Sequence, residues 1–157
     1  MRKRMITQIP EGHAPASESW LDLERVAQVE ITSEAAGHPI EAALLPSDGA
    51  GWRAAQPGEQ TIRVLFDEPQ KLARIRLQFH EDGPERTQEF VLRWSADGGR
   101  SYREIVRQQF NFNPGDTTRE VEDYGLNLVG VTALELTIVP DISGGGACAS
   151  LERLQIA

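Results

Sequence analysis

Four polar side chains in the loop His80–Thr87 carry the groups that a sugar site needs: His80, Glu81, Glu85 and Arg86. Such a site requires planar polar groups that bridge neighbouring hydroxyls, together with an aromatic face for the C–H side of the ring. The alternative, which we favour for an isolated loop of this kind, is a solvated turn whose charges serve solubility. The loop therefore defines a candidate ligand site that needs support from its surroundings.

An aromatic face is available in the segment Gln108–Gly115, where Phe110 and Phe112 alternate with amide side chains just before a turn. Aromatic and amide groups together suit a carbohydrate or a peptide ligand. Because the two phenylalanines are two positions apart, they can instead both lie on the core face of a strand. Large apolar residues are usually buried. We favour the core position and keep the ligand platform as the alternative.

Catalytic motifs are absent from the sequence. It has no Gly-x-Ser-x-Gly elbow, no His-Glu-x-x-His and no Cys/His pair at a useful spacing. Acidic residues are scattered over turns and solvent faces, so no carboxylate pair can be named. The sequence predicts a protein that is not an enzyme, with no catalytic residue and no cofactor.

Metal-binding and phosphate-binding patterns are missing as well. His13 and His38 have no ligand pattern near them. Cys148 is the only cysteine, which excludes an intramolecular disulfide and a cysteine-based zinc site, and we expect it to be a small buried hydrophobe. The segment Asp141–Ala147 lacks the Lys and Ser/Thr of a phosphate-binding loop and is interpreted as a loop at one end of the fold.

The elements that must position these residues are short strands. Apolar residues alternate with polar ones over four to eight positions, which is typical of half-buried β-strands. The alternating sets are Ala27/Val29/Ile31, Ile62/Val64/Phe66, Ile75/Leu77/Phe79, Phe90/Leu92/Trp94, Leu134/Leu136/Ile138 and Leu154/Ile156. Turn residues separate them, and Ala96–Arg100 predicts a hairpin. The one helix-like stretch, Pro39–Leu45, is too short to change the all-β class.

Composition limits the class of partner. The chain has 157 residues, with 24 acidic and 16 basic side chains and a formal net charge of −8. This excess of acid argues against nucleic acid or an anionic membrane as the main partner. Residues 1–19 are polar and predict a loosely held leader before one domain over residues 20–157. Without a signal peptide or a membrane span, we expect a cytoplasmic protein.

Five pieces of sequence, in this order, resemble the discoidin family, also called F5/8 type C or galactose-binding-like domains. The resemblance covers about residues 20–157. The pieces are an early strand that runs into Thr32–Glu34, the loop Glu41–Ala43 leading to Gly51-Trp52, and the segments Gly58–Val64, Phe90–Tyr102 and Ala149–Ile156. It implies a single antiparallel jelly-roll β-sandwich that holds its ligand with loops at one end. It also implies a core position for Trp52. The alternation of Trp94 with Phe90 and Leu92 independently predicts that Trp94 is buried, whereas Trp20 cannot be placed.

The sequence differs from the family at two positions where family members bind calcium. Leu45 stands seven residues before Trp52, where the family has Asp, and Arg153 stands where it has Glu. Because calcium needs oxygen ligands, we expect no metal there. We expect the Arg153 guanidinium near the vacated cation position, with Asp48 as its partner.

Together these features predict a non-catalytic binding module. We expect carbohydrate to be held by end loops near His80, Glu81 and Arg86, with Phe110 or Phe112 as platform. The alternative is an intracellular protein-interaction domain of the same fold. A sugar site needs an exposed aromatic near the His80 loop, whereas a protein interface needs a wider exposed apolar patch. The sequence leaves the sugar, the partner and the oligomeric state open.

Overall fold

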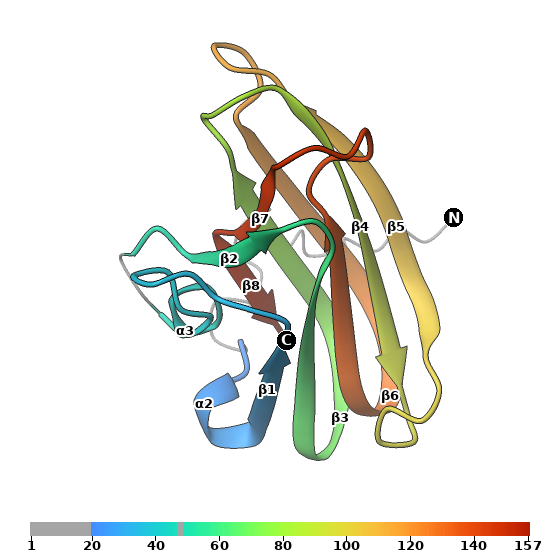
Figure 1. Cartoon of the computed structure of the whole chain (residues 1–157). Helices are drawn as coiled ribbons and strands as arrows, with labels where there is room; N and C mark the ends of the chain where they lie inside the picture. The colour runs from blue at the N-terminus through green and yellow to red at the C-terminus, as the bar shows by residue number, and fades with distance from the viewer. Residues whose placement is uncertain (1–19, 47–48) are drawn as a thin grey trace, which may run out of the picture.

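The computed structural model describes residues 20–46 and 49–157 of the chain. The predicted leader lies outside these residues. Within them, Figure 1 shows a β-sandwich with two short helices beside it. In chain order the elements are α2 (Leu23–Val26), β1 (Ala27–Ile31), α3 (Glu41–Leu44), β2 (Trp52–Pro57), β3 (Gln60–His80), β4 (Arg86–Ser95), β5 (Arg103–Phe112), β6 (Arg119–Val139), β7 (Cys148–Leu151) and β8 (Arg153–Ile156).

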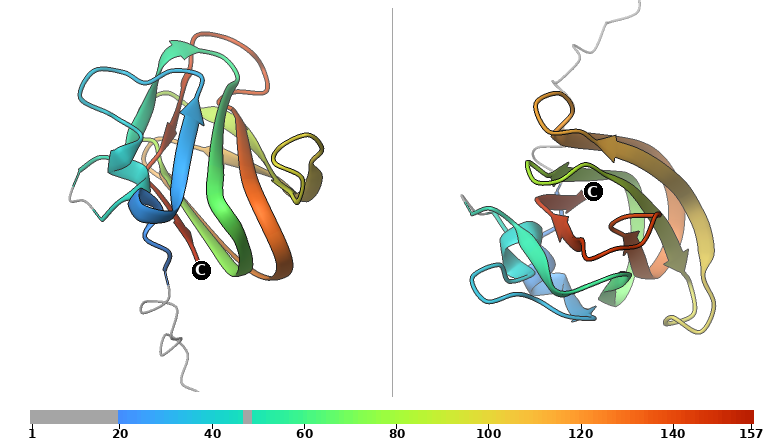
Figure 2. Two further views of the ribbon diagram at one scale, coloured as in Figure 1. Left: turned by 90° about the horizontal axis from the view of Figure 1, so that it is seen from below. Right: turned by 45° about the horizontal axis from the view of Figure 1, so that its top comes forward.

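The strands pair antiparallel throughout. The larger sheet has the order β1-β3-β6-β4-β5, and β8 joins it by pairing with the second half of β3. β2 and β7 form a separate two-stranded sheet. The right panel of Figure 2 shows the larger sheet curving around the C-terminal segment that carries β7 and β8. The predicted all-β antiparallel sandwich is confirmed.

The two longest strands, β3 and β6, each fold back on themselves, as Figure 1 shows at its lower end. They pair with each other on both sides of the bend, and the register shifts between Leu65 and Arg74. Asp67–Pro69, a sequence of turn residues, lies in this bend of β3. Because of the fold-back, the first half of β3 pairs with β1 and the second half pairs with β8. One two-stranded ribbon thus supplies strands to both layers of the sandwich.

The core lies between the layers and contains the predicted alternating residues. The fully buried ones include Ile62, Val64, Leu77, Phe79, Phe90, Leu92, Leu136, Ile138, Leu154 and Ile156. Each such side chain contributes about 1.5–3 kcal/mol when it leaves water. This set is what holds the bent ribbon against β4 and β8.

The three tryptophans differ in burial. Trp52 is 1% exposed, and its indole Nε1 donates to the carbonyl of Ser33 at 3.0 Å, so a buried polar group is satisfied. Trp94 is only half-buried and packs at the edge of the core, with the Arg103 guanidinium 5.9 Å from its ring centroid. The predicted core position of Trp94 is therefore confirmed in part, since the side chain packs against the core but stays partly exposed. Trp20, unplaced by the sequence, lies half-buried beneath the Arg74 guanidinium.

Three loops meet at the upper end of the sandwich in Figure 1. The amide of Glu81, after β3, donates to the carbonyl of Thr118 at 2.8 Å. The amide of Ile142, after β6, donates to the carbonyl of Thr87 at 2.9 Å. These bonds hold the loops after β3, β5 and β6 together at one end. No helix within residues 20–46 and 49–157 is long and apolar enough to cross a membrane.

Candidate functional site

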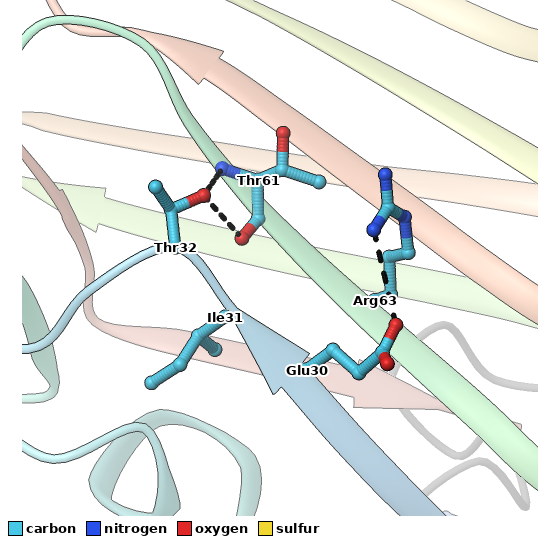
Figure 3. Close-up of a pocket in the computed structure, with 5 residues that line it drawn as sticks. All are labelled: Glu30, Ile31, Thr32, Thr61 and Arg63. Carbon is cyan, nitrogen blue, oxygen red and sulfur yellow. Dashed lines mark hydrogen bonds and ion pairs between the residues drawn. The ribbon is translucent and has the colours of Figure 1, made fainter.

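A shallow hollow lies on the face of β1 and β3, and most of its polar groups are engaged with one another. It has a volume of about 310 Å³, and Figure 3 shows its lining residues. Thr32 Oγ1 donates to the carbonyl of Thr61 at 3.2 Å and accepts from the Thr61 amide at 2.9 Å. Arg63 faces Glu30 at 3.8 Å. Because these polar groups already bind one another, the hollow is a poor candidate for a ligand site.

A cleft between two loops at the upper end of the sandwich gathers the predicted loop residues. Its volume is about 630 Å³, and we call it the end-loop cleft. One wall is formed by residues 81–86, the other by residues 141 and 144–148, and Arg53 of β2 completes the lining. A smaller hollow of about 240 Å³, which includes His38, Trp52 and His80, adjoins it, since Arg53 and Asp82 line both.

Arg86 forms the base of the end-loop cleft, with its side chain only 2% exposed. Its Nε donates to Glu81 Oε1 at 2.9 Å, and its Nη1 donates to the carbonyl of Pro140 at 2.7 Å. Its guanidinium stacks over the ring of Phe112, with 4.7 Å between the guanidinium carbon and the ring centroid. One side chain therefore ties the loop after β3 to the loop after β6. The interpretation of this loop as only a solvated turn was wrong, because Arg86 and Glu81 are buried.

Glu81 keeps one carboxylate oxygen free for a ligand. Its side chain is 10% exposed, and Oε1 is occupied by Arg86. Oε2 has no hydrogen-bond partner among the described residues. A Cβ built on Gly83 would lie 3.4 Å from Oε2, so this oxygen faces the turn that lines the end-loop cleft. An ionised carboxylate oxygen is an acceptor only, so Oε2 can accept a hydrogen bond from a ligand donor.

A second buried acid lies behind Arg86. Arg86 Nη1 donates to Gln88 Oε1 at 3.2 Å, and Gln88 Nε2 donates to Glu120 Oε1 at 3.2 Å. Glu120 is 1% exposed. Burial, reinforced by the neighbouring Glu122 carboxylate, raises the pKa of Glu120 to about 8. Gln88 and Glu120 were missed, although each stands at an inward-facing position of its strand.

The other predicted residues divide between the surface and the core. His80 is half-buried in the adjoining hollow, and its Nε2 lies 3.8 Å from Asp82 Oδ2. Glu85 is exposed and lines the end-loop cleft. Phe112 is fully buried beneath Arg86 and presents no face to a ligand, so the core position is confirmed for it. Phe110 is half-buried at the core edge, with its ring 5.0 Å from that of Phe112.

Several cleft residues were not predicted as site residues. Arg53 lines both hollows, and its side chain has no ion pair with any described residue. Asp141 lines the opposite wall, where its Oδ1 accepts from the Ser143 amide at 3.0 Å. Cys148 is half-buried at the start of β7 and also lines the end-loop cleft, so it is less enclosed than expected. None of the three has a sequence motif, because the cleft is formed by segments far apart in the chain.

Leu45 and Arg153, the residues at the calcium positions of the resemblance, line a different hollow of about 650 Å³ beside α2 and α3. The proposed partner Asp48 lies outside the described residues. Asp22 and Glu24 also line this hollow. In the part of the chain that the structure describes, no three His, Cys, Asp or Glu side chains are placed to hold a metal ion.

Residues 28–152 match the family model of the F5/8 type C domain. A structural neighbour is the family 32 carbohydrate-binding module of C. perfringens NanJ in complex with galactose, with a TM-score of 0.63 and 14% identity over 87% of this chain and 96% of that one. Another is a module of the same type from Clostridium perfringens in complex with GalNAc-beta-1,3-galactose, with a TM-score of 0.62 and 16% identity over 88% and 99%. A pectin-binding module aligns with a TM-score of 0.55 and 16% identity over 84% and 90%. No curated protein matches the sequence.

Proposed function

Because this chain belongs to the F5/8 type C domain family, we propose that it is a non-catalytic carbohydrate-binding module that holds its ligand in the end-loop cleft. The observation that carries the proposal is the buried Glu81–Arg86 pair beneath the cleft. The pair fixes the two loops whose polar groups face the cleft, and a preorganised site loses less entropy when it binds. Solved neighbours of the same fold hold sugars, which supports this choice of ligand class.

The polar side chains that line the cleft have two roles: some hold the loops in position, and others are free to contact a ligand. Arg86 has its Nε and Nη1 engaged within the protein, so we assign it to positioning rather than to ligand contact. Arg53, Asp82, Glu85 and the free oxygen of Glu81 are the groups left to bind sugar hydroxyls. Paired donors and acceptors of this kind suit vicinal hydroxyls.

An exposed aromatic platform is missing from this cleft. Among the aromatic residues in the described ranges, Trp52 lines the adjoining hollow but is 1% exposed, and Phe112 is fully buried. Recognition would therefore depend on hydrogen bonds, which exchange with water and give small net free energies. We expect weak, millimolar-range binding of a single sugar unit, about 4 kcal/mol.

A protein-interaction domain is the second candidate, and the surface supports it less. Its expected signature is a wide exposed apolar patch. Among the described residues, the exposed large hydrophobics are Val121, Val129 and Ile142. Val129 lies in the bend of β6, where the register with β3 shifts, whereas Val121 lies near the start of β6 and Ile142 follows its end. These residues are scattered and do not form one patch.

The test is a glycan array followed by NMR titration of the purified protein. We expect reproducible binding to a subset of glycans, with chemical-shift changes confined to the loops around residues 81–86 and 141–148. Arg53→Ala should abolish or weaken binding. Arg100→Ala, in the exposed hairpin turn at the other end, is the matched control and should bind as wild type. An absence of shift changes with every array hit and at millimolar monosaccharide would overturn the proposal.

A further inference from the structure

We propose that the end-loop cleft prefers a sugar with a positive charge, an amino sugar with a free ammonium group, and disfavours a uronic acid. The inference rests on the proposed carbohydrate function and names the class of ligand. It starts from the unbalanced charge around the cleft. Solved neighbours of this fold do not determine that charge, because their low identity establishes the fold alone.

The charges at the base of the cleft cancel. Arg86 is neutralised by Glu81 across a 2.9 Å ion pair. Behind it, Glu120 is surrounded by Gln88, by the like charge of Glu122 and by the more distant Arg86, with Phe79 opposite it on β3. These surroundings keep the Glu120 carboxyl mostly neutral near pH 7. The net charge of the site is therefore set by the groups at its rim.

At the rim, three carboxylates face one guanidinium. Asp82, Glu85 and Asp141 line the end-loop cleft, and the only basic side chain besides Arg86 among its lining residues is Arg53. The Asp82 side chain is 84% exposed, and its nearest basic group is His80 at 3.8 Å. The rim thus has an excess of two negative charges, which attracts a cation and repels a carboxylate within roughly a Debye length of 10 Å.

A free acceptor at the cleft points to a ligand with donors. Glu81 Oε1 accepts from Arg86, whereas Glu81 Oε2 lies near the turn at Gly83 without a hydrogen-bond partner among the described residues. An ammonium group supplies three N–H donors and no acceptor, so it can satisfy this oxygen and a rim carboxylate together. A uronic acid would instead bring a second acceptor to an oxygen that needs a donor.

A metal ion would be the other way to compensate these acids. Calcium needs six to eight oxygen ligands that converge on one point. In residues 20–46 and 49–157, no three acidic, histidine or cysteine side chains are arranged to hold a metal. The carboxylates therefore surround the cleft without converging, which fits an extended organic cation better than a bare ion.

The experiment compares ligands that differ in charge. Galactosamine and glucosamine, their N-acetyl forms, galactose, glucose and galacturonate are titrated by NMR at a pH where the free amines are protonated. We expect the free amines to bind about two- to fivefold more tightly than the N-acetyl forms, which is the effect of one exposed ion pair. The advantage should shrink in high salt, and galacturonate should bind weakest.

Substitutions of the acidic side chains at the rim test which of them cause the preference for the amino sugar. Asp141→Asn and Glu85→Gln should each reduce the ratio of the affinity for the amine to the affinity for galactose. Glu68→Gln, an exposed acid in the bend of β3, is the control and should leave the preference intact. Because Cys148 is the only cysteine and lines the cleft, a bound amino sugar should also slow its alkylation.

The outcomes separate the two proposals. Binding of neutral sugars with no gain for the amines would overturn the charge preference and leave carbohydrate binding standing. Tighter binding of galacturonate would do the same. No binding of any sugar would overturn the carbohydrate function itself. Preference for the amine that persists in Asp141→Asn and Glu85→Gln would show that the rim acids are not its cause.

Discussion

At the scale of single residues, Arg86 has the largest structural role in the candidate site. It bonds to the loop after β3 through Glu81, to the loop after β6 through Pro140, and to its own strand through Gln88. Phe112 supports the plane of the guanidinium from below. These contacts at Nε, at Nη1 and on the ring of Phe112 compensate the buried charge, whereas Nη2 is buried without a hydrogen-bond partner.

Removal of this guanidinium should destabilise the fold. Arg86→Ala would leave the Glu81 carboxylate buried without its partner, and breaking a buried pair costs about 3–5 kcal/mol. The measurement is the free energy of unfolding from urea denaturation. Arg100→Ala, at an exposed turn, should stay within about 0.5 kcal/mol of wild type. Equal free energies of unfolding for the two variants would contradict the role of Arg86 as a buried side chain that links the two loops.

Glu120 predicts how stability depends on pH. Its pKa is about 8 in the folded protein, against an ordinary value of 4.5. Between these values the folded state retains a proton that the unfolded state has lost, so the contribution of Glu120 to stability falls as pH rises from about 4.5 to 8. Thermal unfolding between pH 5 and 9 should therefore show a downward slope that Glu120→Gln reduces. An identical slope in the variant would contradict a buried protonated carboxyl.

At the scale of elements, the joint between β2 and the C-terminal segment depends on a close backbone approach. Gly51 precedes β2 with a φ of +82°, and a Cβ there would lie 2.6 Å from Glu152 Cα. β2 pairs with β7 just beyond this point, and β2 carries Arg53 to the cleft. The placement of one cleft residue therefore depends on a glycine outside the cleft.

Substitution at this joint should cost more than substitution at an open glycine. Gly51→Ala combines a left-handed backbone, which costs about 1–2 kcal/mol for an L-residue, with a steric clash. Gly58→Ala is the matched control, since Gly58 has a φ of +90° and nothing within 4 Å of an added Cβ. Chemical denaturation of both variants measures the difference. If Gly58→Ala proved as destabilising as Gly51→Ala, the close approach would not be the cause.

At the scale of the whole molecule, two hollows of the sandwich differ in chemistry. The end-loop cleft gathers charged groups on a buried polar base. The hollow beside α2 and α3 has Leu45 and Arg153 at the positions where the resemblance places calcium ligands. An apolar side chain and a cation cannot replace two carboxylates as ligands of a hard cation.

Calcium should therefore leave the stability of the protein unchanged. A ligand that binds only the folded state raises the melting temperature by mass action, so a protein without the site shows no shift. The melting temperature is measured in chelator and in millimolar calcium, with magnesium as the ionic-strength control. A sharp rise specific to calcium would show that other oxygens complete a site at this hollow.

The sequence by itself determined the class of fold, because period-two alternation and turn residues act locally. Most predicted strands and the Ala96–Arg100 hairpin are found where the pattern places them. Only the tertiary structure decided that Thr61–Phe66 and Leu72–Phe79 belong to one bent strand, since β3 pairs with β6 on both sides of the turn residues.

The candidate site was predictable only in part, because local sequence patterns do not show which distant segments come together. His80, Glu81, Glu85 and Arg86 are close in sequence, so their shared loop was visible as a cluster of polar groups. Whether each side chain faces water or the core depends on segments far along the chain. Pro140 and Phe112 enclose Arg86, and the distant residues that complete the cleft carry no local signal. Burial is a property of the assembled layers, and it turned a predicted surface arginine into the internal support of the cleft.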